Sequence, residues 1–504
     1  MKKLLKTGVG IMYKLLIIFK PFKSNVCQMN KNNLHNSSRR NFIRNGSLVA
    51  AGISIIPRHV LGRGFVAPSD KLNIAAIGAG GKGQSDIANF FKSGNANIVS
   101  LCDVDDRASA KTRANFPKAS YYKDYREMLA KEGKNIDAVS VSIPDHGHAV
   151  PALMAIQMGK HVYVQKPMTH DIYEARVLTE AARRYKVVTQ MGNQGSSGDG
   201  VRLMQDWYKA GLIGDAHTVR CWTNRPVWPQ GNGYPTTTDA IPPELDWNLW
   251  LGPTAFHEYH AGYVPFSWRG YWDFGTGALG DMGCHIIDPA FKVVGLGYPS
   301  EVECSVADIY EKMWSPAYHP ESCPPAASIK MKFPGKNGKP DVKLTWMDGN
   351  IRPERPDELG ADEPMGNADG GAIIEGTKGK MMCGCYGESP TLLPTSKTKG
   401  INVPQTVERV PGGQEGHYAQ WVNACIAGFG KGHTSSNFDY AGPLTETVLF
   451  ANLALRSWNL KDSKGKFPGR KKLLWDADNM KITNFDEANQ FVRRQYKDGY
   501  TFKA

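Results

Sequence analysis

Apolar residues in the first third of the chain gather into short runs that alternate with longer amphipathic stretches. Residues 72–77, LNIAAI, form one such run, which ends at the glycines of GAGGKG. The following QSDIANFFKSG has helical spacing, and NIVSLCDVD at residues 97–105 has the composition of another strand. Short runs without polar alternation are typical of strands that are buried on both faces of a parallel sheet.

The same alternation continues to residue 192. Residues 134–144 and 161–167 predict two more strands, and residues 148–160 predict a helix between them. Residues 185–192 predict a further strand. Strands that alternate with helices indicate a doubly wound parallel sheet, in which ligands bind at the carboxyl ends of the strands. We therefore predict an α/β fold that begins with a Rossmann domain over residues 70–192.

The pattern changes in the second half of the chain. After a predicted helix, glycine stop and strand within residues 201–224, several strand-like runs follow, at residues 301–310, 327–333, 342–347 and 371–384. No long helix separates several of them, so we expect a large, mostly antiparallel sheet. Residues 439–458 predict a closing helix. This pattern indicates an α+β domain over residues 193–460 and a C-terminal tail over residues 461–504.

Positive charge is concentrated in a leader at the start of the chain. The formal net charge is +13, and residues 1–63 contribute +12 of it, because they contain twelve Lys and Arg and no Asp or Glu. The remaining +1 gives no reason to expect a nucleic-acid partner. Within the leader, residues 38–44, SRRNFIR, match the twin-arginine export pattern, and an apolar run follows at residues 47–56.

The apolar run is too short to span a membrane and fits the central region of a signal peptide. We therefore expect export by the twin-arginine route, a periplasmic location, and no membrane partner after export. Met29 opens a leader of ordinary length for this route and is an alternative start of the chain.

The glycine loop at residues 78–83 predicts a dinucleotide site. Gly78 permits a tight turn, Gly80 lets a phosphate approach the backbone, and Gly83 lets helix and strand pack closely. The next helix directs its free N–H groups and positive dipole end at the pyrophosphate. Asp103 ends the second strand, where a carboxylate accepts hydrogen bonds from the adenosine ribose and repels a 2′-phosphate. We therefore predict NAD rather than NADP, with a helix cap as the alternative role of Asp103.

Two further motifs, together with the glycine loop, resemble the glucose–fructose oxidoreductase, inositol dehydrogenase and MocA (Gfo/Idh/MocA) family. They are PDHGHAVPALMAIQMGKHVYVQKP at residues 144–167 and GALGDMGCHIID at residues 277–288. The resemblance covers roughly residues 70–460. It implies an NAD-dependent oxidoreductase that acts on a small carbohydrate and forms a homo-oligomer, a dimer or tetramer, through its second sheet.

The resemblance also assigns residues near the cofactor. The lysine of the family's E-K-P triplet stands beside the nicotinamide, often with a cis peptide bond after it, and here that position is Lys166. Gln165 replaces the family's glutamate, which leaves the effect on cofactor placement open. By family position Pro144, His146 and the neighbouring Asp145 and His148 also lie near the cofactor.

Asp281 and His285 are four residues apart, so a helix would place them on one face, and Asp288 would extend that stripe. Oxidation of a carbinol needs a base for the hydroxyl proton, and histidine beside a carboxylate suits that role. The resemblance makes His285 that base, with Lys166 and Asp281 holding the hydroxyls. Asp288 fits the stripe and equally fits an N-cap followed by Pro289.

Two histidine pairs raise the question of a metal. Residues 145–148, DHGH, and residues 257–260, HEYH, lack a second ligand set at a standard structural spacing, so we predict no metal site. Aromatic residues also crowd residues 222–274, at Trp222, Trp228, Tyr234, Trp247, Trp250, Tyr259, Tyr263, Trp268, Tyr271 and Trp272. They are candidates for stacking on a sugar, with local packing as the alternative.

The sequence therefore predicts an exported NAD(H)-dependent oxidoreductase that acts on a carbinol of a sugar, glycoside or polyol. One alternative is a redox-neutral glycosidase or lyase that works through a keto-sugar and keeps its NAD. A glycosidase branch of the superfamily works this way, but it lacks the D-x-G-x-H stretch of residues 281–285. A second alternative is a non-catalytic sugar sensor, and a third is a metal-dependent isomerase.

Overall fold

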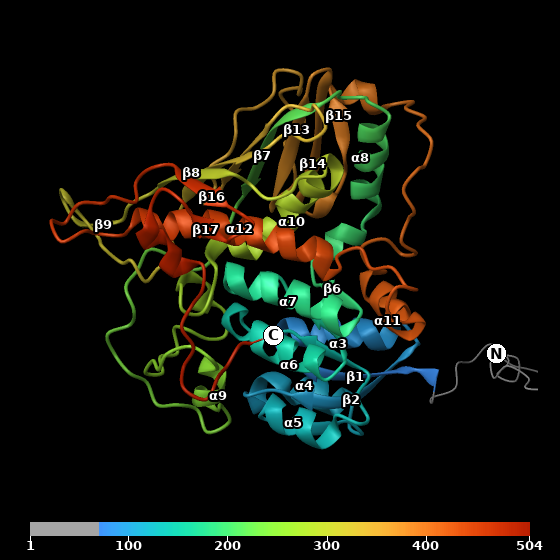
Figure 1. Ribbon diagram of the computed structural model, residues 1–504, viewed down its shortest axis with the longest axis vertical. Coiled ribbons are helices and arrows are strands. Elements are labelled where there is room, and N and C mark those ends of the chain that lie inside the picture. The colour runs from blue at the N-terminus through green and yellow to red at the C-terminus, as the bar shows by residue number, and fades with distance from the viewer. Residues whose placement is uncertain (1–69, 504) are drawn as a thin grey trace, which may run out of the picture. The chain divides into compact units, whose positions relative to one another are not determined.

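The computed structural model describes residues 70–503 (Figure 1). The predicted leader, with its twin-arginine motif and the alternative start at Met29, lies outside the described residues. The chain first builds a six-stranded parallel sheet in the order β3-β2-β1-β4-β5-β6. Its strands are β1 (Leu72–Ile77), β2 (Ala96–Cys102), β3 (Ser120–Tyr122), β4 (Ala138–Val141), β5 (His161–Val164) and β6 (Thr189–Met191). The doubly wound parallel sheet that the sequence predicted is confirmed.

Helices follow the strands of this sheet, as the amphipathic stretches predict. They are α3 (Gly81–Lys92), α4 (Asp106–Asn115), α5 (Tyr125–Glu132), α6 (Ala149–Gln157) and α7 (Ile172–Tyr185). α7 begins at a capping box, in which Asp171 accepts from the backbone N–H of Glu174 and the Glu174 side chain accepts from the N–H of Asp171. Such reciprocal bonds satisfy donors that the first helical turn leaves unpaired.

The second half of the chain builds a nine-stranded sheet in the order β15-β14-β13-β7-β12-β11-β8-β16-β17. Its strands are β7 (Ala216–Thr223), β8 (Glu301–Val306), β11 (Ala327–Phe333), β12 (Val342–Met347), β13 (Gly370–Gly376), β14 (Gly379–Gly384), β15 (Thr391–Leu393), β16 (Leu473–Asp476) and β17 (Lys481–Ile482). All neighbouring strands are antiparallel except β7 and β12. A mostly antiparallel second sheet is therefore confirmed.

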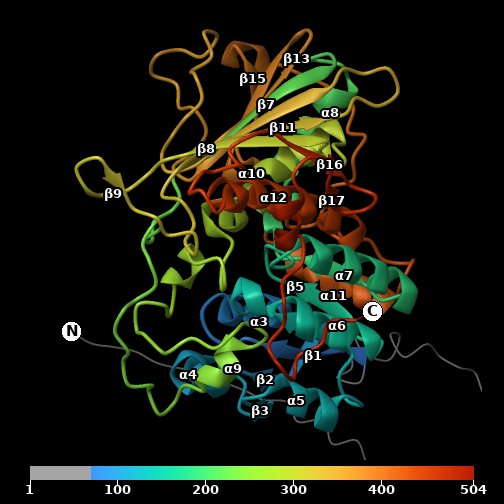
Figure 2. The same cartoon turned by 60° about the vertical axis from the view of Figure 1, so that its left-hand side comes forward.

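Two helices connect the sheets. α10 (Gly277–Val294) packs against β7 and β13, and α12 (Phe438–Trp458) packs against α7 and α10. Figures 1 and 2 show both helices between the large sheet and the helices of the parallel sheet. α10 therefore lies at the boundary of the two sheets. Within residues 70–503 the remaining α-helices are α8 (Asp199–Lys209), α9 (Trp247–Leu251) and α11 (His417–Ala427), and a separate hairpin pairs β9 (Tyr310–Lys312) with β10 (Ser315–Pro316).

The last part of the chain packs against both halves. β16 joins β8 at the edge of the large sheet, whereas Arg494 reaches back to the capping box of α7 and contacts Glu174 at 2.7 Å. α11 packs against α3 of the first half. The segment predicted as a tail therefore contributes to the folded core over its described length. Among residues 70–503, no helix is both long and apolar enough to cross a membrane.

Candidate active site

The predicted residues Lys166, Asp281 and His285 meet where the parallel sheet adjoins α10. Lys166 follows the carboxyl end of β5, and its peptide bond to Pro167 is cis. Its Nζ donates to Asp281 Oδ1 at 2.7 Å and to the Asp281 carbonyl oxygen at 2.8 Å. Asp281 and His285 lie on consecutive turns of α10, as the four-residue spacing predicted. The structure therefore brings the three residues of the predicted catalytic set into one cluster.

Asp281 is an ionised carboxylate at the centre of the cluster. Burial by itself would raise its pKa, but the charges of Lys166 and Arg269 outweigh burial and lower the pKa to about 2. The Nε atom of Arg269 lies 3.6 Å from Asp281 Oδ1, and the Nε atom of Arg225 lies 3.9 Å from Oδ2. Three cations thus surround this one carboxylate.

His285 is almost completely buried, with 4% of its surface exposed. Burial, followed by the positive charge of Lys166, holds its pKa well below the usual value. Its ring lies against Tyr386, with 4.6 Å between the ring centres, and its Nδ1 has no hydrogen-bond partner within the described residues. The imidazole is therefore neutral at neutral pH, and its Nδ1 is available for a hydrogen bond to a ligand.

The glycine loop has the geometry that a dinucleotide needs. Gly78 has a φ of +89°, and a Cβ on Gly83 would lie 2.0 Å from the Gly78 carbonyl oxygen, so helix α3 and strand β1 approach closely. α3 starts after Gly80 without a side-chain cap, which leaves its first N–H groups available to an anion. The loop therefore fits the pyrophosphate role that we predict for it.

Asp103 lies against this loop. Its Oδ2 accepts from the backbone N–H groups of Ala79 and Gly80 at 2.8 and 2.9 Å, and its Oδ1 accepts from the N–H of Asp105. The N-cap of α4 is Asp105, so the alternative reading of Asp103 as a helix cap is wrong. A carboxylate has about four acceptor positions, so Asp103 retains capacity for a ribose hydroxyl.

The predicted cofactor residues at positions 144–148 lie in a short turn between β4 and α6. Both ring nitrogens of His146 face carbonyl oxygens, of Phe274 and Trp250, and burial lowers the pKa of His146 to about 4. His148 is held in the same way between the carbonyls of Pro167 and Ile143. This arrangement favours a positioning role for both histidines, and the cofactor contact of Pro144 stays a prediction.

Gln165 contacts a group that the sequence did not suggest. Its Nε2 donates to Asp86 Oδ2 at 2.7 Å, and Asp86 also accepts from Ser142 and from Lys82. Asp86 belongs to α3 and is fully buried. An amide can donate to a buried carboxylate, whereas the glutamate expected from the family would place a second carboxylate there. Asp86 therefore explains why position 165 carries an amide donor rather than a carboxylate.

Asp288 is not a helix N-cap, which corrects one of the two readings of this residue. α10 continues through Pro289 to Val294, so Asp288 lies inside the helix. Its Oδ1 accepts from Asn193, Ser196 and Tyr440, at 3.1, 3.2 and 2.7 Å. The helix that contains Pro289 packs against β7 and β13. Asp288 therefore joins α10 to neighbouring segments.

The aromatic residues between positions 222 and 274 pack mainly on each other. Trp247, Tyr259, Tyr263 and Trp268 belong to one buried cluster, and Trp222 is buried within β7. These contacts favour the packing alternative over sugar stacking for this group. Among the described residues, no group of three or more His, Cys, Asp or Glu side chains is placed to hold a metal ion.

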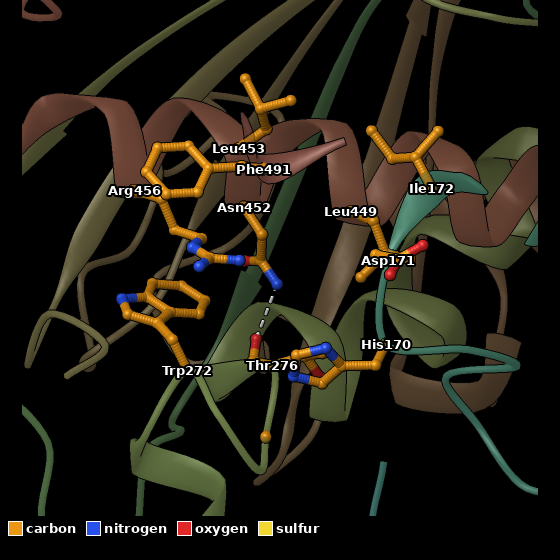
Figure 3. A pocket seen from close by; sticks show the side chains of 11 residues that line it. His170, Asp171, Ile172, Trp272, Thr276, Leu449, Asn452, Leu453, Arg456 and Phe491 are labelled. Atoms are coloured by element: carbon orange, nitrogen blue, oxygen red, sulfur yellow. Dashed lines mark hydrogen bonds between the residues drawn. The ribbon is translucent and has the colours of Figure 1, made fainter. Parts of the chain in front are cut away.

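A small cavity is lined by residues of α12 and by residues near the start of α10, as Figure 3 shows. His170, Asn452 and Arg456 point into it, and Asn452 donates to the Thr276 carbonyl oxygen at 2.8 Å. Its volume of about 20 Å³ suits one water molecule rather than a sugar. The hydroxyl of Thr276 donates to Asp145, so this cavity borders residues that position the site.

A larger hollow of about 480 Å³ borders the site on the side of Tyr386. Glycine-rich loops line it together with Asp199, Glu388 and Gln414. Its size lies in the range of small-molecule pockets. Tyr386 has a φ of +65° and contacts both this hollow and His285, so the two regions share one wall.

Sequence analysis missed Arg225, Arg269, Tyr386 and Asp86. The two arginines fall in the aromatic-rich stretch, where no spacing or motif distinguishes them. Tyr386 follows Cys385 after β14, far along the chain from α10. Only Asp86, four residues from Lys82 on a predicted helix, carried a local signal, because charges at this spacing pair along one face.

Comparison with known proteins identifies family models that match both halves of the described chain. Residues 72–193 match the model of an oxidoreductase family with an NAD-binding Rossmann fold, GFO_IDH_MocA. Residues 218–333 match the model of that family's C-terminal alpha/beta domain. Both matches fall on the halves that carry the two sheets.

Curated relatives include "Glycosyl hydrolase family 109 protein" from Shewanella sp. (strain W3-18-1), 26% identical over 207 residues. The same description applies to a protein of Shewanella baltica (strain OS185), 27% identical. Each alignment covers 36% of this chain and 45% of the relative, so the chain spans about half the length of the curated relatives it matches.

Solved structures share the fold at low identity. "Levoglucosan dehydrogenase, complex with NADH and L-sorbose" has a TM-score of 0.53 and 16% identity, covering 76% of this chain and 97% of that chain. The WlbA dehydrogenase from Bordetella pertussis, in complex with NADH and UDP-GlcNAcA, has a TM-score of 0.51 and 16% identity, covering 76% and 96%. These similarities show a common fold.

Proposed function

We propose that this chain, which has both domains of the Gfo/Idh/MocA oxidoreductase family, oxidises a carbinol of a sugar, glycoside or polyol with NAD and acts outside the cytoplasm. The observation that carries the proposal is the cluster of Lys166, Asp281 and His285. The cluster lies at the carboxyl end of the parallel sheet, where ligands of this architecture bind. Assembly into a dimer or tetramer through the large sheet is part of the same proposal.

Each residue of the cluster has a distinct task. His285 is neutral at neutral pH and takes the proton from the substrate hydroxyl. Lys166 donates a hydrogen bond to that same oxygen, which stabilises the negative charge that develops as the proton leaves. Asp281 fixes the position of the Lys166 ammonium through two contacts. When bound, NAD supplies the acceptor for the hydride from the carbinol carbon.

Residues of the first half fit NAD. The uncapped N-terminus of α3 suits the pyrophosphate, and Asp103 lies beside it with acceptor capacity for the ribose. A 2′-phosphate would meet the Asp103 carboxylate, so NADP is disfavoured. Lys166 lies at the end of β5, on the side of the sheet where the nicotinamide would reach the substrate.

Export explains how such an enzyme would use its cofactor. A periplasmic enzyme has no exchangeable nicotinamide pool, so release of NADH after each turnover would stop it. The twin-arginine route carries folded proteins, and the motif at residues 38–44 supports export with the cofactor already bound. The proposal therefore includes NAD that stays bound and is recycled within the site, by a second sugar or by the same substrate.

The test begins with protein purified from the periplasm without added cofactor. After unfolding, the released nucleotide is assayed, and close to one NAD per chain is expected. A panel of sugars and glycosides should then be converted without added NAD. Changing Arg39 and Arg40 to Lys gives the export control, which should leave the protein in the cytoplasm. An empty site that works only with added NAD would contradict the recycling step. If neither bound nor added NAD were reduced by any sugar, the oxidoreductase activity itself would be contradicted.

A redox-neutral glycosidase or lyase is the second candidate. The curated relatives described as glycosyl hydrolases favour it, although they align over less than half of their length. The same cluster serves this reaction, since oxidation of a hydroxyl precedes elimination. Product analysis separates the two candidates: a keto-sugar with an intact glycosidic bond supports the oxidoreductase, whereas a released aglycone and no net change of NAD support the glycosidase. Saturable sugar binding with neither product would support a sensor.

A further inference from the structure

Two arginines lie near Asp281, although this carboxylate already forms an ion pair with Lys166. Lys166 already donates to Asp281 Oδ1 at 2.7 Å. Arg269 and Arg225 approach the same carboxylate only to 3.6 and 3.9 Å, distances that are beyond a hydrogen bond. They therefore add positive charge to the site without serving as hydrogen-bonding partners of Asp281.

Other contacts hold both guanidinium groups in place. Arg225 Nη1 donates to Asp369 Oδ1 at 3.1 Å and to Asn224. Arg269 Nη1 donates to the carbonyl oxygen of Phe266 at 3.2 Å, and its guanidinium lies over the ring of Phe266. The orientation of each group is thus set before a ligand arrives, which reduces the entropy lost on binding.

Both arginines retain unused donors. The bonds described above involve only Nη1 of each side chain, so Nη2 of Arg225 and Nη2 of Arg269 have no protein acceptor among residues 70–503. Each side chain is 21% exposed, which makes it accessible without placing it on the open surface. Arginine presents its N–H groups as a planar fork that matches a carboxylate.

The cations around the site are not all paired. Asp281 pairs with Lys166, and Asp369 pairs with Arg225. Asp145 also lies near Arg269 and Lys166, but burial raises its pKa and disfavours its charged form. Within residues 70–503, Arg269 has no carboxylate closer than 3.6 Å, so an anion on the ligand would be its first hydrogen-bonded partner of opposite charge. Both arginines lie within 3.6 to 3.9 Å of the carboxylate that pairs with Lys166, so an anion bound to them would lie close to the proposed reacting group. We propose that the substrate is an acidic sugar, a uronic acid or uronide, whose carboxylate binds Arg225 and Arg269.

This inference rests on the proposed oxidoreductase function and names its substrate class. A neutral sugar with the same ring configuration as the uronide lacks the carboxylate. It would leave the Nη2 donors of Arg225 and Arg269 without an anionic partner. Loss of a hydrogen bond to a charged group costs affinity, on the order of tenfold or more.

The experiment uses full-length protein with its bound nucleotide and pairs of methyl glycosides. Each pair has one ring configuration, gluco, galacto or manno, with a hydroxymethyl group in one member and a carboxylate in the other. Absorbance follows the first reduction of the bound nicotinamide, product analysis follows turnover of the sugar, and thermal shift reports binding independently of turnover. We expect one configuration in which the uronide has a KM at least about tenfold lower than its neutral partner, with a difference that shrinks as salt is added.

Variants locate the effect. Arg269→Gln and Arg225→Gln should each raise the KM for the uronide about tenfold and reduce its thermal shift. Arg269→Lys keeps the charge without the fork and should recover part of the loss. Arg183→Gln is the control, because Arg183 pairs with Asp439 on the exposed surface of α7 and its removal should leave the uronide preference unchanged.

The outcomes separate this inference from the function on which it rests. Oxidation of neutral members without any uronide preference overturns the acidic substrate and leaves the oxidoreductase standing. A uronide preference that survives both Arg→Gln variants also overturns it. A thermal shift with uronides that depends on the arginines, without any reduction of the nicotinamide, supports the carboxylate site and contradicts the proposed reaction.

Discussion

The two ends of α10 carry similar residues with opposite tasks. Near its start, Asp281 is paired with Lys166 and its pKa is lowered to about 2 despite burial. Seven residues later, burial raises the pKa of Asp288 although the charge of Lys292 opposes it, and its hydrogen-bond donors are neutral groups such as Tyr440. A carboxylate held by cations stays charged and can organise a reaction, whereas one held by neutral donors joins structural elements. The helix therefore contributes chemistry at one end and stability at the other.

Substitutions of Lys166 and Lys292 should give the largest difference in turnover between the two ends of α10. Lys166→Ala should lower turnover on the order of a thousandfold, because the hydrogen bond to the reacting oxygen is lost. Bound NAD should remain, as measured after unfolding. The matched variant is Lys292→Met, at the far end of α10, where Nζ donates to the Ser435 carbonyl oxygen at 2.6 Å. It should lower the melting temperature and leave turnover of the folded protein intact. Release of NAD from Lys166→Ala with normal chemistry would contradict the role of Lys166.

His285→Gln tests the base at the same end of the helix. Turnover should fall on the order of a hundredfold, since glutamine cannot take up the hydroxyl proton. In the unaltered protein the acidic limb of kcat/KM should lie below pH 6.5, because burial and Lys166 lower the pKa of His285. This limb should disappear in the variant. Turnover close to that of the unaltered protein, measured on the true substrate, would remove His285 from the mechanism.

Asp288→Ala tests the structural end. Removing the carboxylate leaves Asn193, Ser196 and Tyr440 without their shared acceptor, so the free energy of unfolding should fall by about 1–3 kcal/mol. Asp288→Asn keeps the acceptor oxygen and should recover most of that stability. Urea unfolding measures both variants. If Asp288→Ala instead abolished turnover at full stability, Asp288 would belong to the reacting groups.

The smallest effect is the pH dependence of stability in the two Asp→Asn variants. A lowered pKa means that Asp281 contributes stability above the unfolded value near 3.9, and that this contribution is lost as pH falls toward 2. For Asp288 the sign is reversed, because its pKa is raised and its charged form is disfavoured in the folded protein. Its contribution to stability is therefore lost as pH rises through the pKa of the folded state. From pH 3 to pH 7, Asp281→Asn should therefore become less stable relative to the unaltered protein, and Asp288→Asn more stable. Calorimetry measures the stability of both variants against pH. If the two stability profiles ran parallel, the pKa shifts of Asp281 and Asp288 would not be opposite.

The sequence by itself determined the parallel sheet, the large antiparallel sheet and the helical spacing of Asp281 and His285. These features follow from periodicity and from glycine stereochemistry, which are local properties of the chain. Gly78 and Gly83, for instance, indicated a close contact of strand and helix that the structure contains.

Only the tertiary structure decided which distant groups share the site. Arg225, Arg269 and Tyr386 reach α10 from short segments whose sequences carry no motif, and Asp86 accounts for Gln165 from another helix. It also decided the role of Asp288, because the helix continues through Pro289 where the local pattern allowed a cap. Packing against the large sheet supplies the support that the isolated segment lacks. Charge balance and burial are sums over neighbours in space, so they could not be read along the chain.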